Sequence, residues 1–473
     1  MKPYPRYKDS GVEWLGRIPD HWKCKKIKHI TQLQGGFAFK SKSFTETGIP
    51  IVRIGDIQSI IDWECCKKVP QYIKVTKDFL IKKHDTLIAL SGATTGKTTF
   101  IDSEPEYSYI NQRVAKASFD NKMIYFLLSC SNVQELIKLI AAGSAQENIS
   151  NAQIGNITVC IPSDKQEQTA IATFLDRKTA EIDKLIANKE RLIELYEEKK
   201  QAVINQAVTK GLDPDAEMKD SGVEWLGEIP KHWEVTHLKY LIKELESGVS
   251  VNATDHPAID NDYGVLKTSC VYNYEFTPEE NKAVWPEELS RVKTSPRKGE
   301  IIISRMNTPE LVGASGYVNS YYQNLFLPDR LWQTLFYSHV QIDTYWLSFI
   351  FKSSKFRELL SVTATGSSPS MKNLAKEDFL NISIPFPLKK EQTTIVHHIE
   401  TQCNRIDAII NKLKKQINLF KEYRTALISE VVTGKVDVRN ESIRQARGML
   451  SPCTCNNTAE YRDRIKRNPG MRA

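Results

Sequence analysis

The sequence lacks any hydrophobic run that approaches the roughly 18 residues needed to cross a bilayer, and its opening stretch MKPYPRYKDSG has no apolar signal core. It also lacks an HExxH pair and paired Cys or His at zinc-finger spacing. We therefore expect a soluble, cytoplasmic protein without a metal site. The nine cysteines are irregularly spaced, and in that compartment we expect all of them to be reduced thiols.

Excess charge is also missing from most of the chain. The net charge is +8, but residues 439–473 contain eight Lys or Arg and three Asp or Glu, so +5 of this charge lies there. A nucleic-acid surface elsewhere must therefore come from local clustering of basic residues, because the rest of the chain is nearly neutral. Residues 439–473 show no periodicity, and we expect them to form a basic, disordered tail.

The main positive feature is a repeated stretch. Residues 8–22 read KDSGVEWLGRIPDHW and residues 219–233 read KDSGVEWLGEIPKHW, with thirteen of fifteen positions identical at an offset of 211. This match indicates a tandem duplication, so each later feature should be sought twice. Because the Trp-rich stretch is the same in both copies, we expect it to be a structural clasp rather than a binding surface.

The ends of the two copies match, whereas their middles differ. The Glu-Gln pair at residues 167–168 corresponds to the pair at 391–392, and Ile-Pro precedes each pair at residues 161–162 and 384–385. The offset thus grows from 211 at the start of the repeat to 224 at its end, because the second middle is longer. A shared frame around divergent middles is the pattern that the function has to explain.

Each middle has the pattern of strands combined with helix. Short β-branched runs such as GIPIVRIGDI and GEIIIS predict strands, and amphipathic stretches predict helices over residues 121–142 and 343–361. The fold class is therefore α/β (α+β). The predicted domain boundaries are 1–160 for the first domain, 161–213 for a central helix, 214–383 for the second domain, 384–438 for a C-terminal helix and 439–473 for the tail.

The end of each copy is a long stretch with a helical period. Residues 164–209 contain no Pro or Gly. Apolar side chains there recur with a 3.5-residue period, at Ile171, Leu175, Ile182, Leu185, Leu192, Tyr196 and Val203. The corresponding positions of the second copy are Ile395, Ile399, Ile406, Ile409, Gln416, Phe420 and Leu427. We predict two long helices that pair as a coiled coil.

One motif nearly matches a phosphate-binding P-loop. Residues 91–98 read SGATTGKT, but Ser91 replaces the first glycine of GxxxxGK[ST]. The sequence that follows, TFID, is typical of a strand rather than of the helix that a P-loop requires, and the second copy has no GK at this place. No other catalytic set stands out. We therefore expect a non-enzymatic protein, with a nucleotide-dependent enzyme as an alternative.

Polar side chains suited to DNA occur at matching places in the two middles. Arg, Asn and Gln form paired hydrogen bonds with purine edges, and Ser, Thr and Lys contact phosphates. The candidates in the first middle are Arg53, Ser91, Thr94, Thr95, Lys97, Asn111, Gln112 and Arg113. Those in the second middle are Ser304, Arg305, Asn307, Thr308, Arg330, Ser367 and Lys372. The alternative is that a residue such as Arg330 pairs with an acid inside its own domain.

The chain resembles the specificity subunits of type I restriction–modification systems. The likeness is carried by the doubled SGVEWLGxIPxHW, the GEIIISRMNT and LPDRLW stretches, the IP…EQxxI entry into each helix and the ID within it. It covers about residues 7–438, and the tail departs from the family's usual ending.

This resemblance implies two target-recognition domains that each read one half of a bipartite DNA sequence, with antiparallel helices as a spacer. It also implies two methyltransferase subunits and translocase–endonuclease subunits as partners, for adenine methylation and ATP-dependent cleavage. No cofactor is then expected in this chain, while the partners use S-adenosylmethionine, ATP and Mg²⁺. A coiled-coil scaffold that does not bind DNA remains an alternative.

Overall fold

The computed structural model describes residues 2–439, apart from residues 59, 74, 104, 106, 143–146, 260–261 and 369–370. It divides into unit 1, which comprises Met1–Asn188 with Lys415–Ala473, and unit 2, which comprises Lys189–Lys414. Apart from Arg439, the predicted tail lies outside the described residues. Each unit thus takes one divergent middle and parts of both long helices.

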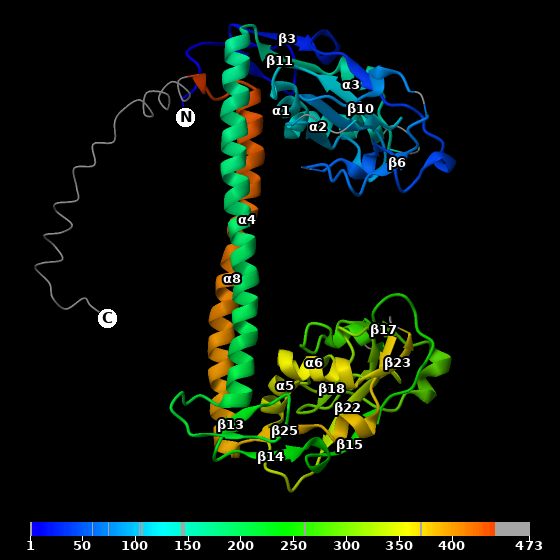
Figure 1. The fold of residues 1–473 in the computed structure, drawn as a ribbon, viewed down its shortest axis with the longest axis vertical. Coiled ribbons are helices and arrows are strands. Elements are labelled where there is room, and N and C mark those ends of the chain that lie inside the picture. Colours follow the sequence, from blue (N-terminus) through cyan, green and yellow to red (C-terminus); the bar gives the residue numbers. More distant parts are fainter. Residues whose placement is uncertain are drawn as a thin grey trace, which may run out of the picture. The chain divides into compact units, whose positions relative to one another are not determined.

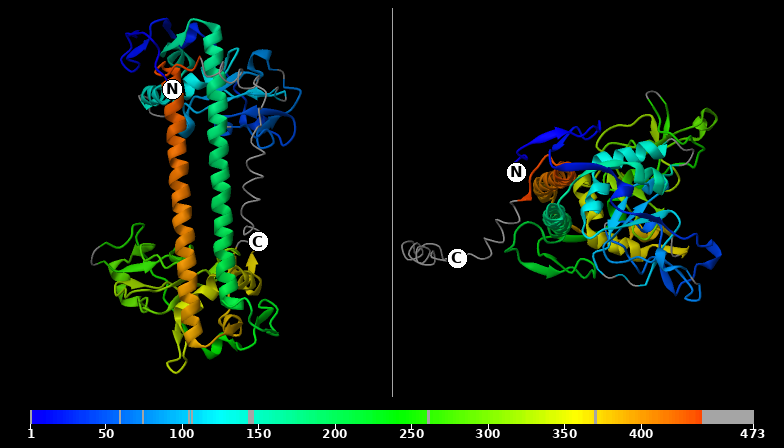
Figure 2. Two further views of the ribbon diagram at one scale, coloured as in Figure 1. Left: turned by 90° about the vertical axis from the view of Figure 1, so that its left-hand side faces the viewer. Right: turned by 90° about the horizontal axis from the view of Figure 1, so that it is seen from above.

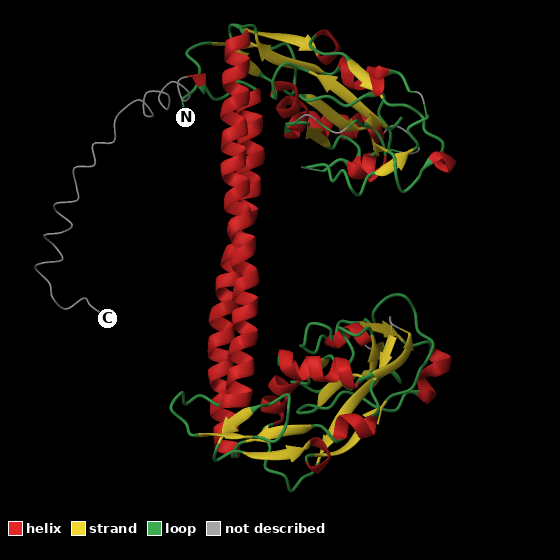
Figure 3. Ribbon diagram, viewed as in Figure 1, coloured by secondary structure: helices red, strands yellow, loops and turns green. Residues whose placement is uncertain are grey.

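Both units mix strands and short helices (Figure 3). The strands of unit 1 are β1 (Tyr7–Asp9), β2 (Arg17–Pro19), β3 (Trp22–Lys26), β4 (Leu33–Gly35), β5 (Ile49–Val52), β6 (Lys67–Val69), β7 (Asp85–Ala89), β8 (Thr98–Phe100), β9 (Tyr109–Ile110), β10 (Val114–Ser118) and β11 (Thr158–Pro162). Its short helices are α1 (Met123–Ser129), α2 (Ser131–Ala142) and α3 (Asn151–Asn156).

Unit 2 repeats this order of elements with three additional strands among the described residues. Its strands are β12 (Met218–Asp220), β13 (Glu228–Pro230), β14 (Glu234–His237), β15 (Ile242–Ser247), β16 (Gly264–Leu266), β17 (Asn281–Ala283), β18 (Ile301–Ser304), β19 (Met306–Asn307), β20 (Ser315–Tyr317), β21 (Leu325–Phe326), β22 (Leu331–Phe336), β23 (Thr365–Ser368), β24 (Met371–Asn373) and β25 (Ser383–Phe386). Its short helices are α5 (Thr344–Lys352), α6 (Ser354–Thr363) and α7 (Lys376–Leu380).

The two middles share one sheet topology although their sequences differ. The central sheet has the order β4-β10-β7-β8 in unit 1 and β15-β22-β18-β20 in unit 2, with antiparallel pairs throughout. A smaller sheet contains one parallel pair in each unit, β5 with β9 and β16 with β21. All residues of β7 and β18 are buried, because other elements cover both faces of these strands. The predicted α/β class is confirmed.

The two predicted short helices are each broken into two. The chain is extended at Cys130, between α1 and α2, and at Ser353, between α5 and α6. The Ser353 hydroxyl donates to the carbonyl of Ile350, so a short polar side chain takes a carbonyl in the last turn of the helix before the break. Among the described residues no single helix is long and apolar enough to cross a membrane, although α1 and α2 would qualify together across their 61° bend.

The long helices are α4 (Lys165–Lys210) and α8 (Lys389–Val432), which run side by side within each unit (Figures 1 and 2). In unit 1 the Asp183 carboxylate accepts from the Arg424 guanidinium at 2.9 Å, and in unit 2 Asp407 accepts from Lys200 at 2.8 Å. Going along α4 from Asp183 to Lys200, the partner residue in α8 moves backward in the sequence, from Arg424 to Asp407. The helices are therefore antiparallel.

The contact positions of these helices repeat every eleven residues rather than every seven. The predicted seam residues Leu185, Leu192 and Ile409 are 46%, 43% and 38% exposed. The inward positions are instead Ile171, Ile182, Ile193 and Ile204 of α4, and Ile395, Ile406, Ile417 and Ile428 of α8. An eleven-residue repeat gives 3.67 residues per turn, so nearly straight helices keep the seam. The predicted 3.5-residue period therefore fails at Leu185, Leu192 and Ile409, whereas the predicted position Leu427 is buried.

The repeated Trp stretch is a structural clasp, as predicted. Trp22 and Trp233 are 0% exposed. The Trp22 indole donates to Glu167 at 3.1 Å, and the Trp233 indole donates to Glu391 at 2.9 Å. Each clasp thus holds the first turn of a long helix through a carboxylate, which is buried in Glu167 and half-buried in Glu391. In unit 1, Tyr4 also donates to Glu167, and burial together with this carboxylate raises the pKa of Tyr4.

The structure corrects the predicted match of the two Ile-Pro pairs. Gln168 donates to the carbonyl of Pro162 at 2.9 Å, and Gln392 donates to that of Pro387 at 2.8 Å. The structural equivalent of residues 161–162 is therefore Phe386-Pro387, and not residues 384–385. The second copy has one residue fewer between this proline and the glutamine, so the alignment by Ile-Pro alone was misplaced by two positions.

The expectation of nine reduced cysteines is also wrong. Cys24 of β3 and Cys160 of β11 are directly opposed in an antiparallel pair, with Cα atoms 4.1 Å apart, and form a disulfide. The two residues are 136 positions apart in the sequence, so spacing could not reveal their pairing. In unit 2 the same register places Val235 opposite Pro385.

Candidate nucleic-acid interface

One hairpin in each unit carries about half of the predicted DNA-contacting residues. The hairpin β7–β8 closes through hydrogen bonds from Ala89 N–H to the carbonyl of Lys97 and from Gly96 N–H to that of Ala89. The hairpin β18–β20 closes in the same way, from Ser304 to Ala314 and from Gly313 to Ser304. The loops between these closing pairs differ in sequence and length. A common hairpin therefore presents different side chains in the two units.

A second loop lies beside each hairpin and ends in an arginine. In unit 1 the carbonyl of Arg113 accepts from Leu90 N–H at 2.9 Å, and in unit 2 the carbonyl of Arg330 accepts from Arg305 N–H at 3.0 Å. Leu90 and Arg305 each follow the first strand of a hairpin. Arg113 and Arg330 therefore occupy equivalent positions, as the sequence predicted, and both are exposed.

A third loop lies beside the hairpin in each unit, and the sequence reasoning missed most of the residues in these loops. Ser91 forms a β-bridge with Asn148, and Asn307 pairs with Lys372 across β19 and β24. We call loops 91–97, 111–113 and 147–148 recognition surface 1, and loops 305–308, 329–330 and 371–373 recognition surface 2. The signal for Asn148 was available, since the polar loop GSAQENIS occupies the same place in the first copy as TGSSPSMKN does in the second.

Recognition surface 1 includes a pocket beside the hairpin loop. Ser91 and Arg113 line it together with Gly92, Ala93, Glu147 and Asn148. Lys97 and Gln112 are also exposed, whereas Thr94 and Asn111 are half-buried. Thr95 is buried and donates to the carbonyl of Gly92, which leaves it out of the surface. Arg53 is half-buried and pairs with Asp56 at 3.4 Å.

The predicted residues of recognition surface 2 are mostly half-buried. The amide of Asn307 donates to the Tyr272 hydroxyl at 2.8 Å, and Arg305, Thr308 and Lys372 are half-buried. Ser304 is fully buried and does not reach the surface. Ser367 belongs to β23, and its side chain lies outside the described part of the chain.

The alternative role for Arg330 is an internal ion pair. Arg330 is exposed, and within the described residues no acid forms an ion pair with it. Its guanidinium therefore suits an external anion or a base edge.

The P-loop likeness of residues 91–98 does not extend to the backbone. Gly92–Thr94 form a short 3-10 turn, and Thr98 begins strand β8. A P-loop places phosphate at the N-terminus of a helix, which this hairpin does not provide. The loop instead offers hydroxyls and one lysine at the tip of a sheet.

Comparison with known proteins gives the family. Residues 19–195 and 230–419 match the family described as type I restriction modification DNA specificity domain. The chain belongs to this family. Specificity subunits recognise the DNA target sequence of a type I restriction–modification system and are non-catalytic, so the resemblance seen in the repeated signature is confirmed.

Individual relatives are similar over most of their length. The chain is 22% identical over 452 residues to the MjaVIII specificity subunit of Methanocaldococcus jannaschii, covering 90% of this chain and 95% of that protein. It is 23% identical over 423 residues to the EcoKI specificity subunit of Escherichia coli, covering 85% and 86%. A solved chain from work on complex assembly and conformational transition of the type I R-M system has a TM-score of 0.66 at 14% identity, covering 89% of this chain and 99% of that chain, which supports the fold.

Proposed function

We propose that each unit of this specificity subunit reads one half of a bipartite DNA target through its own recognition surface. The observation that carries the proposal is the equivalence of Arg113 and Arg330, each beside a hairpin loop that differs between the units. Arginine is the side chain that most often reads guanine in the major groove, through its paired donors. A common backbone with different loop residues is what two readers of different sequences need.

Not all predicted residues enter this proposal. The exposed or half-buried ones remain as candidate DNA contacts, whereas Thr95 and Ser304 are withdrawn because both are buried. Asn148 and Asn373 are added, because they lie beside the hairpin loops in recognition surfaces 1 and 2. Lys97 and Lys372 suit phosphates, since an ammonium is a compact point charge.

The proposed binding of the partner subunits rests on the parts of the two copies that are alike. The two clasps use the same Trp–Glu hydrogen bond, so two copies of one methyltransferase subunit can bind equivalently. These subunits methylate adenine with S-adenosylmethionine, and translocase–endonuclease subunits cleave DNA with ATP and Mg²⁺. The antiparallel helices α4 and α8 act as the spacer between the half-sites.

The test uses the assembled complex in cells and reads the methylated sequences. We expect Arg113→Ala to relax one position of the first half-site and Arg330→Ala one position of the second, each by about 1–3 kcal/mol of discrimination. Lys25→Ala and Lys231→Ala are matched controls, because both lysines are exposed in the shared frame. The proposal is wrong if both arginine variants methylate the original target with unchanged fidelity, or if either one alters both half-sites.

A further inference from the structure

Both hairpin loops rest on a helix through a glycine. Gly96 and Gly313 occupy the same position of the hairpin and have φ angles of +86° and +71°. A Cβ on Gly96 would lie 2.9 Å from Oε1 of Gln134, and one on Gly313 would lie 3.0 Å from Nη1 of Arg357. Only glycine combines this conformation with so close an approach.

The helix positions that meet the glycines are equivalent, although the residue types differ. Gln134 of α2 donates its backbone N–H to the carbonyl of Cys130 at 2.9 Å, and Arg357 of α6 donates its own to that of Ser353 at 3.0 Å. Both therefore stand at the same distance from a helix break. One turn further along each helix, Gly96 meets Ile137 and Gly313 meets Leu360. The two middles differ in sequence, but in both of them the glycine of the hairpin loop contacts the same two positions of the neighbouring helix.

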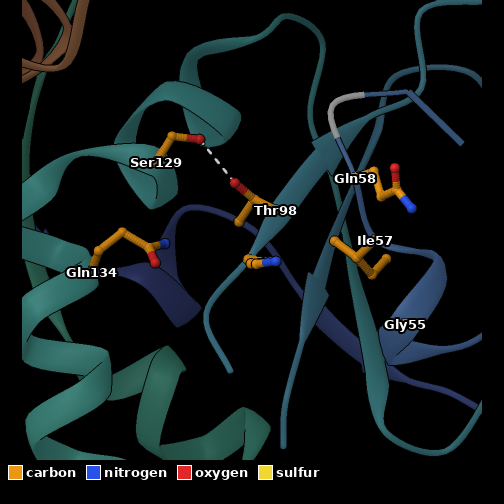
Figure 4. Close-up of a pocket in the computed structure, with 7 residues that line it drawn as sticks. Gly55, Ile57, Gln58, Thr98, Ser129 and Gln134 are labelled. Atoms are coloured by element: carbon orange, nitrogen blue, oxygen red, sulfur yellow. Dashed lines mark hydrogen bonds between the residues drawn. The ribbon is translucent and has the colours of Figure 1, made fainter. Parts of the chain in front are cut away.

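In unit 1 the side chain at this position ties the loop to the helix pair. The Gln134 amide donates to the carbonyl of Gly96 at 2.7 Å and to that of Leu128 in α1. Figure 4 shows Gln134 extending from its helix toward the strand that carries Thr98, whose hydroxyl lies 2.8 Å from that of Ser129. Lys97 lies between Gly96 and Thr98, so these contacts fix the backbone of a candidate DNA contact.

In unit 2 the equivalent side chain makes more contacts with the loop. Arg357 is buried and donates to the carbonyl of Val312 at 2.7 Å and to that of Glu310 at 2.8 Å. Its guanidinium also lies 5.3 Å from the centre of the Tyr274 ring. Both carbonyls belong to a turn within the loop in which Leu311 N–H and Val312 N–H donate to the carbonyl of Thr308, a residue of recognition surface 2.

We propose that Gln134 and Arg357 are equivalent positioning residues, which set the conformation of the two recognition loops and thereby the sequence specificity of each half-site. The inference rests on the proposed function, because it assumes that these loops read DNA. A loop that recognises bases must be held within about 0.5 Å of its binding geometry by supporting residues. Neither Gln134 nor Arg357 needs to touch DNA for this role. Arg357 holds two loop carbonyls and Gln134 holds one, so removing Arg357 should have the larger effect.

The test compares Gln134→Ala and Arg357→Ala in the full chain, assembled with its methyltransferase partner. We expect Gln134→Ala to reduce discrimination at the first half-site about tenfold and leave the second unchanged, and Arg357→Ala to do the reverse, more strongly. Lys138→Ala and Lys355→Ala, which are exposed on the same two helices, should change neither half-site.

Hydrogen exchange of the free chain gives a readout that does not depend on DNA. Amides of residues 90–97 should exchange faster in Gln134→Ala, and those of residues 305–314 faster in Arg357→Ala, while β10 and β22 stay protected. If Arg357→Ala loosens all of unit 2, Arg357→Gln decides the matter, because it supplies the side chain of unit 1 and should restore both loop protection and the second half-site.

The outcomes separate the two proposals. Wild-type exchange and wild-type discrimination in both alanine variants would overturn the positioning role, whatever the loops do. Faster loop exchange without any change of the methylated sequence would instead mean that the loops are held as described but do not read DNA. In that case the proposed function fails.

Discussion

The central sheets of the two units meet the same hydrogen-bonding need with different side chains. In unit 1, Lys116 donates to the carbonyl of Leu80 and lies 3.6 Å from the Asp85 carboxylate, which accepts from Lys82 N–H at 2.8 Å. Both charged side chains are buried. The unit therefore uses an ion pair to satisfy one backbone carbonyl and one backbone N–H.

Unit 2 satisfies the equivalent groups with one neutral residue. The Gln333 amide donates to the carbonyl of Ser295 at 3.2 Å, and its Oε1 accepts from Arg297 N–H at 2.8 Å. Gln333 and Lys116 occupy the same register position, opposite Ile302 and Leu87. The comparison teaches that the backbone pattern of the middles is preserved while the side chains that complete it are exchanged.

Substitution of Lys116 or Gln333, which share one buried register position, should show the largest difference in stability between the units. Lys116→Met leaves Asp85 without its counter-ion, and we expect unit 1 to lose about 3–5 kcal/mol. Gln333→Met leaves one carbonyl and one N–H unpaired, and we expect unit 2 to lose about 1–3 kcal/mol. Hydrogen exchange of β10 and β22 in the full chain measures both. Equal losses of stability in the two variants would contradict the prediction, because they would show that an unpaired buried carboxylate destabilises the unit no more than unpaired backbone groups do.

The disulfide distinguishes the units next. Reduction, or Cys24→Val, which introduces the residue that unit 2 has at this register, should lower the stability of unit 1 by about 2–4 kcal/mol. Unit 2 should not change, because Val235 and Pro385 cannot form a disulfide. Denaturant titration with and without reductant checks this, and a stability of unit 1 that ignores reductant would contradict it.

A smaller effect concerns Glu300, the acid at the start of the hairpin β18–β20 of unit 2. Burial raises the pKa of Glu300, which accepts from Thr334 at 2.8 Å. Its protonated form is favoured on folding, so the stability that it contributes at low pH is lost as the pH rises through its raised pKa. We therefore expect the stability of Glu300→Gln relative to wild type to increase from pH 4 to pH 7. The exposed Glu358→Gln is the control, and a flat difference would contradict the prediction.

The smallest effect should come from the paired ions of the long helices. The offset of 224 relates Asp183 to Asp407 and Lys200 to Arg424, so the pair of Asp183 with Arg424 is equivalent to that of Asp407 with Lys200. Exchanging the bases, Arg424→Lys and Lys200→Arg, should change stability by less than about 0.5 kcal/mol each, because the pairs are partly exposed. Thermal unfolding at low and high salt measures this, and a larger change would indicate that the pairs set the helix register.

The sequence by itself determined the duplication, the α/β class, the long helices and the family, because identity and periodicity are visible along the chain. It also indicated Arg113 and Arg330, since each ends a polar run at the same place in its copy. The clasp followed from the same identity. These features depend on local sequence. The structure confirms the class, the long helices and the clasp, and the comparison with known proteins confirms the family, whereas the DNA contacts of the two arginines stay a prediction.

Other features were decided by contacts between distant residues. The Cys24–Cys160 pair depends on strand register, and the eleven-residue seam depends on which face of α4 meets α8. Seven- and eleven-residue patterns coincide over the first turns of a helix and diverge only later, and the burial of Ile204, Ile417 and Ile428 shows which pattern faces the partner helix. Gln134 and Arg357 share no residue type, and only the fold brings each against the glycine of a loop. Only the tertiary structure decided these features, because each depends on which residues the fold brings into contact and not on a pattern of neighbouring residues in the sequence.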